Sequence, residues 1–115
     1  MKIYEKIEIS AAHQLKNHDG KCKNFHGHNY IVEVWIEHER IDEETNMVAD
    51  FGKIKKAVME LDHKDLNEIM EEDNPTAEKI VLWIISRLEN FIRCHTLRVR
   101  VWEDRDSYAE DEVHI

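Results

Sequence analysis

Four stretches of the chain alternate apolar and polar side chains, which is typical of β-strands with one buried face. In residues 2–13 the apolar face ends in a histidine, and in residues 26–38 the apolar face begins with two histidines. Residues 96–103 repeat the pattern, and residues 108–115 repeat it more weakly after a short turn. Because strand side chains point alternately to two faces, the apolar faces of the first three strands are predicted to consist of Ile3, Ile7, Ile9, Ala11 and His13; His26, His28, Tyr30, Val32, Val34 and Ile36; and Leu97, Val99, Val101 and Glu103.

Between the second and third of these strands, apolar positions recur with the spacing of helices. Asp50 is suited to cap a first helix, and a short second helical segment is expected to run to Met70. Pro75 predicts the start of the next helix, at the first helical position, where a missing N–H does no harm. The apolar positions that predict the two main helices are Phe51, Ile54, Val58 and Leu61, followed by Ala77, Ile80, Val81, Ile84, Ile85, Leu88 and Phe91.

The order strand–strand–helix–helix–strand–strand predicts an α+β fold, in which a four-stranded antiparallel sheet carries two helices on one face. No repeat, linker or low-complexity segment interrupts this order, so residues 1–115 are expected to form a single domain. The other face of the sheet carries charged side chains, among them Glu33, Arg98 and Arg100. Such a sheet has two free edges, and pairing of edges between copies of the chain would cover them. We therefore expect a homo-oligomer.

The composition restricts the partners of this domain. A net charge of −9 over 115 residues leaves no excess of cations for phosphate backbones, so we expect no direct binding of nucleic acid. The chain shows neither a signal-peptide pattern at its start nor an apolar run long enough to span a bilayer, so we expect no membrane partner. Two cysteines do not make a disulfide framework. Reduced thiols and a cytoplasmic location are the expectation.

Two histidines separated by one residue are the strongest chemical signal in the chain. His26 and His28 face the same side of their predicted strand, and an antiparallel neighbour ending at His13 would bring a third imidazole beside them. Three neutral imidazoles with an open fourth position are a ligand set of catalytic zinc. The sequence therefore predicts a Zn²⁺ site on these three residues. Four further histidines are expected to bind no metal: His18, His38, His95 and His114.

Cys22 lies in the loop between the first two strands, shortly before His26. Lysines on both sides of it and a nearby metal would favour its thiolate, the form that accepts a proton. One alternative is that Cys22 closes the zinc site as a fourth ligand, so that the metal only stabilises the fold. Another is a loop cysteine without a task. Cys94 follows an apolar helix and is expected to be structural.

Six short motifs follow one another along essentially the whole chain. The motifs are Ser10-Ala11-Ala12-His13, Cys22-x3-His26-Gly27-His28, Met47-Val48-x-Asp50-Phe51, Leu61-Asp62-His63-x2-Leu66-Asn67, Pro75-Thr76-x-Glu78 and Val99-x-Val101-Trp102-Glu103. In this order they resemble the 6-pyruvoyl-tetrahydropterin synthase family. The three-residue gap between Cys22 and His26 resembles the branch that makes 6-carboxy-5,6,7,8-tetrahydropterin for queuosine and archaeosine biosynthesis, a transfer RNA modification pathway.

The resemblance implies a T-fold, in which subunits join their sheets into a barrel, commonly as a hexamer of two stacked trimers with active sites at subunit interfaces. It implies a zinc-dependent carbon–oxygen lyase that converts 7,8-dihydroneopterin triphosphate to 6-carboxy-5,6,7,8-tetrahydropterin, with loss of triphosphate and acetaldehyde. The alternatives within this class are a pyruvoyl-forming synthase and a dihydroneopterin aldolase-like activity. A non-catalytic, zinc-stabilised oligomeric binding module is the alternative from a different class.

The same resemblance implies roles for the site residues. Cys22 would be the general base, and Asp62 and His63 would form a carboxylate–imidazole pair that completes a proton relay with it across a subunit boundary. Glu103 would grip the pterin ring, because a carboxylate can accept from two parallel N–H donors. The motif places Thr76 and Glu78 in the same pocket, although capping of the helix N-terminus explains these two residues nearly as well.

Three positions depart from the family pattern. Ile9 stands in place of Phe, Lys79 in place of Asn, and Asp104 in place of Thr. Asp104 adds a charge beside the residue expected to hold the pterin. The chain has no glycine-rich phosphate loop, and the candidate cations for the triphosphate are Lys21 and Lys23.

Overall fold

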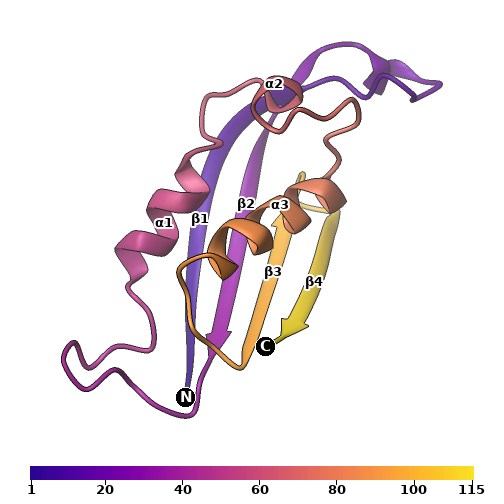
Figure 1. Cartoon of the computed structure of the whole chain (residues 1–115). Helices are drawn as coiled ribbons and strands as arrows, with labels where there is room; N and C mark the ends of the chain where they lie inside the picture. The colour runs from indigo at the N-terminus through magenta and orange to yellow at the C-terminus, as the bar shows by residue number, and fades with distance from the viewer.

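The computed structural model describes all residues from Met1 to Ile115 and contains one antiparallel sheet in the order β1-β2-β3-β4 (Figure 1). Helices α1 and α3 cover one face of the sheet, which confirms the predicted fold class. No helix has the length and apolar character needed to cross a bilayer. The elements are β1 (Lys2–His13), a 3-10 turn (Lys21–Lys23), β2 (His26–Glu37), α1 (Phe51–Met59), α2 (Leu66–Ile69), α3 (Ala77–Glu89), β3 (Thr96–Trp102) and β4 (Tyr108–His114).

The pairing of β1 with β2 brings the histidines of the two strands to one end of the sheet. The register runs without interruption from Lys2 opposite Glu37 to His13 opposite His26, with Ala11 opposite His28. The alternate apolar positions of β1, β2 and β3 pack beneath α1 and α3 in one core. Because the histidines share this core face, they lie where the buried surface meets the end of the sheet.

Helix α3 begins later than predicted. Pro75 lies before the helix, Thr76 is the N-cap, and the first helical residue is Ala77. The Thr76 hydroxyl accepts a hydrogen bond from the backbone N–H of Lys79, at 3.3 Å, which is the usual role of an N-cap side chain. Pro75 is buried, and its carbonyl oxygen is used by the histidine site described below.

Two aromatic residues assigned to the apolar helix faces are exposed instead. Phe51, at the start of α1, is 50% exposed, and Phe91 is 47% exposed. Phe91 follows the end of α3, and its neighbour Ile92 is the residue that enters the core. Helical spacing no longer decides which side chain is buried once the helix has ended. Leu61 is fully buried as expected, although α1 ends before it.

The uncovered face of the sheet carries the predicted charges in paired form. The Glu33 carboxylate accepts hydrogen bonds from the Tyr4 hydroxyl and from Trp102 Nε1, both at 2.6 Å. Burial raises the pKa of Glu33, but these two hydrogen bonds and the charges of Arg100 and Lys6 together outweigh burial and hold the pKa below its usual value. Arg98 stacks 3.9 Å from the ring centre of Trp35. Local pairing thus satisfies Glu33, whereas Arg98 Nε is buried without a hydrogen-bond partner.

Candidate metal centre

The three predicted ligands converge. His13 ends β1, and His26 and His28 begin β2; one ring nitrogen from each lies within 4.8 Å of the others. The ring centres of the three pairs are 4.7, 4.8 and 5.1 Å apart. His13 is fully buried and the other two are half-buried. The cluster is therefore closed toward the core and open on one side.

Backbone carbonyls fix the orientation of two of the rings. His13 Nδ1 lies 2.7 Å from the Pro75 carbonyl oxygen, and His26 Nδ1 lies 2.7 Å from that of Asn24. A carbonyl can only accept, so each Nδ1 donates its proton and each Nε2 keeps a lone pair. Metal-binding histidines commonly have such an outer partner on the second nitrogen.

The distance between the two lone pairs suits a shared cation. His13 Nε2 and His26 Nε2 are 3.1 Å apart, and two lone pairs at this separation repel unless a positive charge lies between them. Zn–N bonds of about 2.0–2.1 Å in tetrahedral geometry separate ligand nitrogens by about 3.3 Å. The three-imidazole donor set, and the tautomers and spacing of His13 and His26, fit a divalent metal ion.

The third imidazole presents an unpaired nitrogen. His28 Nε2 is buried without a hydrogen-bond partner, whereas most buried polar atoms in proteins have one. The nearest carboxylate oxygen, Glu103 Oε1, is 3.4 Å away. Glu103 follows β3 and is half-buried, so this carboxylate lies beside the histidine cluster. That position is compatible with the predicted contact to a pterin bound there.

Burial keeps His13 in the form that a metal requires. Removal from water lowers the pKa of His13, the Pro75 carbonyl partly offsets this, and the two neighbouring histidines lower it further. A neutral imidazole has its Nε2 lone pair available without first losing a proton.

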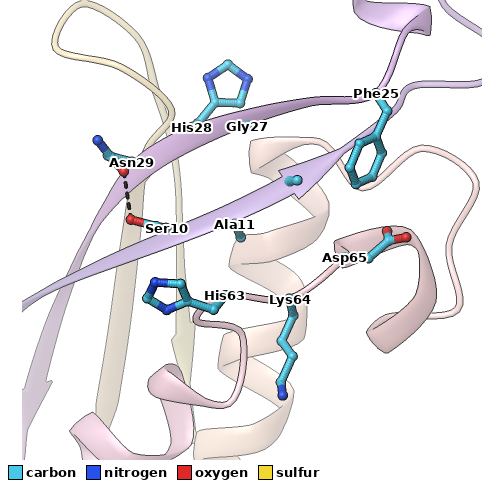
Figure 2. A pocket seen from close by; sticks show the side chains of 10 residues that line it. Ser10, Ala11, Phe25, Gly27, His28, Asn29, His63, Lys64 and Asp65 are labelled. Carbon is cyan, nitrogen blue, oxygen red and sulfur yellow. Dashed lines mark hydrogen bonds between the residues drawn. The ribbon is translucent and has the colours of Figure 1, made fainter.

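An open depression lies beside His28, along the paired ends of β1 and β2 (Figure 2). Its volume is about 510 Å³, which is within the usual range for small-molecule sites. In Figure 2 His28 extends from β2, while His63 lies beyond the outer edge of β1. The lining combines polar and aromatic groups, and its residues are Ser10, Ala11, Ala12, Phe25, Gly27, His28, Asn29, His63, Lys64 and Asp65.

Asp62 and His63 form the predicted pair and attach it to the edge of β1. Asp62 Oδ1 accepts from the backbone N–H of Ser10 at 2.8 Å, and Asp62 Oδ2 accepts from His63 Nδ1 at 2.8 Å. The backbone N–H of His63 donates to the Ser10 carbonyl at 2.6 Å. The Ser10 N–H chiefly, and then His63, hold the pKa of Asp62 below its usual value. The His63 side chain is 81% exposed, so its Nε2 faces solvent.

Within one chain, Cys22 belongs neither to the histidine cluster nor to the Asp62–His63 pair. It lies in the 3-10 turn and is half-buried, and its carbonyl accepts from the backbone N–H of Leu15 at 2.9 Å. It is not among the clustered metal-ligand atoms, which favours an open fourth position over a four-ligand structural site. No hydrogen bond joins Cys22 to Asp62 or His63.

The remaining predicted substrate contacts are exposed, apart from Thr76, which is half-buried. Glu78 is exposed in the first turn of α3 and makes no ion pair, while the hydroxyl of Thr76 is used in capping. Lys21 and Lys23 are exposed on the 3-10 turn between β1 and β2. The structure thus places the two lysines on the loop that leads into the histidine cluster.

Sequence reasoning missed the groups that orient the ligands. The carbonyls of Asn24 and Pro75 belong to the backbone, and their use depends on folding and not on residue type. Tyr30 is fully buried with its hydroxyl 3.4 Å from His13 Nδ1, and burial raises its pKa. The only sequence feature that pointed to Tyr30 was its position on the same face of β2 as His26 and His28.

This sheet, its helical cover and its three clustered imidazoles define a T-fold protein with a candidate metal centre. The family model described as 6-pyruvoyl tetrahydropterin synthase matches residues 2–112. The chain belongs to this family.

Individual relatives agree with the family assignment. The chain is 38% identical over 95 residues to a 6-carboxy-5,6,7,8-tetrahydropterin synthase of Synechocystis, covering 76% of this chain and 74% of the relative. It is 36% identical over 117 residues to a dihydroneopterin monophosphate aldolase of Pyrococcus furiosus, covering 96% of each chain. The fold resembles the 6-pyruvoyl tetrahydropterin synthase of Caenorhabditis elegans, with a TM-score of 0.75, 24% identity and coverage of 98% and 95%. The family and its relatives indicate a pterin-processing lyase.

Proposed function

We propose that the chain is a zinc-dependent lyase that converts 7,8-dihydroneopterin triphosphate to 6-carboxy-5,6,7,8-tetrahydropterin and releases triphosphate and acetaldehyde. The observation that carries the proposal is the convergence of three imidazole nitrogens, with His28 Nε2 buried and unpaired. The relative named for this product supports the choice of reaction. Residues 1–115 would act as one catalytic domain in the cytoplasm, without a nucleic-acid or membrane partner.

The metal would be held by His13, His26 and His28. Zinc at this position would supply Lewis-acid chemistry, by polarising side-chain oxygens of the substrate and acidifying the adjacent C–H bond. Around it, the protein contributes ring orientation through the carbonyls of Pro75 and Asn24. Glu103 would accept hydrogen bonds from the pterin ring beside the cluster.

Proton transfer would fall to Cys22 and to the Asp62–His63 pair. The Cys22 thiolate would accept a proton from the substrate carbon. Asp62 holds His63 Nδ1–H, which leaves His63 Nε2 free to carry the second proton near neutral pH. Because these groups do not meet within one chain, we propose that the relay forms between Cys22 of one subunit and the pair of another.

The sheet edges support assembly of copies into a barrel. The segment that follows Asp62 covers the end of β1, through hydrogen bonds at Ser10 and Ala12. The rest of the β1 edge and the whole of the β4 edge have no strand partner. We propose a homohexamer of two stacked trimers, in which these edges join neighbouring chains into a barrel. Light scattering should give six times the chain mass; a monomer at micromolar concentration would contradict this.

The test of function is anaerobic incubation of zinc-loaded protein with dihydroneopterin triphosphate, with pterin products and acetaldehyde measured together. Acetaldehyde and a carboxypterin in equal amounts are expected. A pyruvoyl product would agree with the proposed use of zinc and Cys22 but would assign the chain to the pyruvoyl-forming synthases. The variant Cys22→Ala should retain zinc and lose turnover, whereas a closed structural site would lose zinc. Absence of turnover with zinc bound would favour the non-catalytic binding module.

A dihydroneopterin aldolase-like activity is the second candidate. It is favoured by the relative from Pyrococcus furiosus, which matches nearly the full length of both chains. An aldolase would cleave a carbon–carbon bond of the side chain without releasing triphosphate. Parallel incubations with dihydroneopterin and its monophosphate, followed for aldehyde products, separate the two reactions.

A further inference from the structure

The side chain of Asn67 binds the backbone of the residue next to His13. Asn67 Oδ1 accepts from the backbone N–H of Gln14 at 2.8 Å, and Asn67 Nδ2 donates to the Gln14 carbonyl at 2.8 Å. This double contact resembles one step of a β-ladder, with a side-chain amide in place of a second strand. Both backbone groups of Gln14 are satisfied by this one side chain.

The same amide reaches the loop that orients His13. Asn67 Nδ2 also donates to the Asp73 carbonyl at 3.2 Å. Asp73 lies two residues before Pro75, whose carbonyl accepts from His13 Nδ1. Asn67 therefore ties together two backbone segments, one carrying the histidine and the other carrying the carbonyl that sets the direction of its ring.

Asn67 is itself held in place by its helix. It lies in α2, which crosses the end of β1 (Figure 1). The Asp65 carboxylate caps α2 by accepting from the backbone N–H of Asn67 at 3.0 Å, and Asp65 pairs with Ala12 in an isolated β-bridge. The amide of Asn67 is thus fixed relative to the end of β1 before any metal binds.

We propose that Asn67 is a positioning residue of the metal centre: it holds the end of β1 and the loop before α3 in register, so that His13 Nε2 points into the histidine cluster. The inference rests on the proposed zinc function. Removal of an outer partner of a metal ligand typically changes metal affinity by about 10–100-fold. Asn67 acts on His13 through the backbone of Gln14 and through that of Asp73.

The decisive variant is Asn67→Asp, which keeps the size and the Oδ1 acceptor but removes both Nδ2 hydrogen bonds. Its zinc affinity is measured by competition with a chelator at a temperature where circular dichroism shows the native fold. We expect a loss of about 10–100-fold relative to the unsubstituted protein, and a changed visible spectrum of the Co²⁺-loaded form. Should this variant not fold, Asn67→Gln, which displaces the same amide by one methylene, carries the same expectation.

The matched control is Asn74→Ala. Asn74 Oδ1 accepts from the backbone N–H of Asn17 at 3.0 Å, so it links neighbouring segments without contacting Gln14. The zinc affinity of this variant should stay within about threefold of that of the unsubstituted protein. The comparison tests whether loss of any hydrogen bond in this region is enough to weaken zinc binding. Native zinc affinity in the folded Asn67 variant would overturn the inference. Lack of zinc binding by the unsubstituted protein would instead overturn the proposed function.

Discussion

At the scale of single residues, His63 combines a costly backbone conformation with an exposed imidazole. Its φ angle is 59°, in the left-handed region, where a residue with a side chain loses about 1–2 kcal/mol. The hydrogen bonds from its backbone N–H to Ser10 and from its ring to Asp62 hold it there. The conformation presents the ring at the edge of β1, which is consistent with a task for the imidazole.

The first prediction separates the ring of His63 from its backbone. Asn tolerates the left-handed region better than Ala. His63→Asn should therefore leave the free energy of unfolding within about 1 kcal/mol of the native value, whereas His63→Ala should lower it by more. Both should lower kcat by about 100-fold or more if the ring carries a proton. Urea unfolding and steady-state kinetics measure the two effects. Native kcat in His63→Asn would exclude the proton-carrier role.

The second prediction concerns the charge of Asp62. Its pKa is lowered in the folded protein by the Ser10 N–H and by His63, so the charged form contributes stability above its unfolded pKa of about 3.9. That contribution disappears as the pH falls through the lower folded pKa. Asp62→Asn should therefore be less stable than the native protein near neutral pH, and the difference should shrink in acid. Urea unfolding across this pH range tests it, and a gap independent of pH would contradict it.

At the scale of elements, α3 begins where the local contacts of Thr76 allow. The hydroxyl of Thr76 caps the helix, and the preceding Pro75 presents its carbonyl to His13. One short segment thus fixes both the start of a core helix and the orientation of a metal ligand. The cap of α3 uses the hydroxyl of Thr76, whereas the orientation of His13 uses the carbonyl of the neighbouring Pro75.

The third prediction uses this separation. Thr76→Val keeps the shape and removes the capping hydroxyl, so the free energy of unfolding should fall by about 1 kcal/mol, while Thr76→Ser should stay close to native. Because the hydroxyl is engaged in the cap, KM should change less than about threefold in either variant. A large rise in KM for Thr76→Val alone would show instead that the hydroxyl contacts the substrate.

At the scale of the whole molecule, the histidine cluster joins the first two strands to the loop before α3. A metal bound to the cluster would therefore link parts of the fold that are far apart in sequence. A ligand that binds only the folded state stabilises it by an amount that grows with the logarithm of its concentration relative to its Kd.

The fourth prediction follows from this linkage. Zinc at about 100 times its Kd should add about 2.7 kcal/mol to the free energy of unfolding, and the melting temperature should rise with zinc concentration. His28→Ala should abolish the shift. His95→Ala, which removes an exposed histidine at the other end of β2, should preserve it. Calorimetry with and without zinc measures the effect, and an equal shift in both variants would place the binding elsewhere.

The sequence by itself determined the strands, the two main helices and the histidine cluster. These features follow from local periodicity: a spacing of two on a strand places His26 and His28 on one face, and the apolar residues of the same face identify it as buried. His13 joined them because its strand alternates in the same way. The Asp62–His63 pair consists of chain neighbours, and the family pattern was enough to single it out.

Only the tertiary structure decided how these residues are held. The contact of His13 with Pro75 spans 62 positions, that of Ser10 with Asp62 spans 52, and that of Gln14 with Asn67 spans 53. No local pattern encodes such pairs, because they depend on how the folded segments lie against one another. The predicted start of α3 at Pro75 was wrong because Thr76 caps the helix and leaves Pro75 outside it. What the tertiary structure decided is that the carbonyl of Pro75 accepts from a histidine at the end of a distant strand.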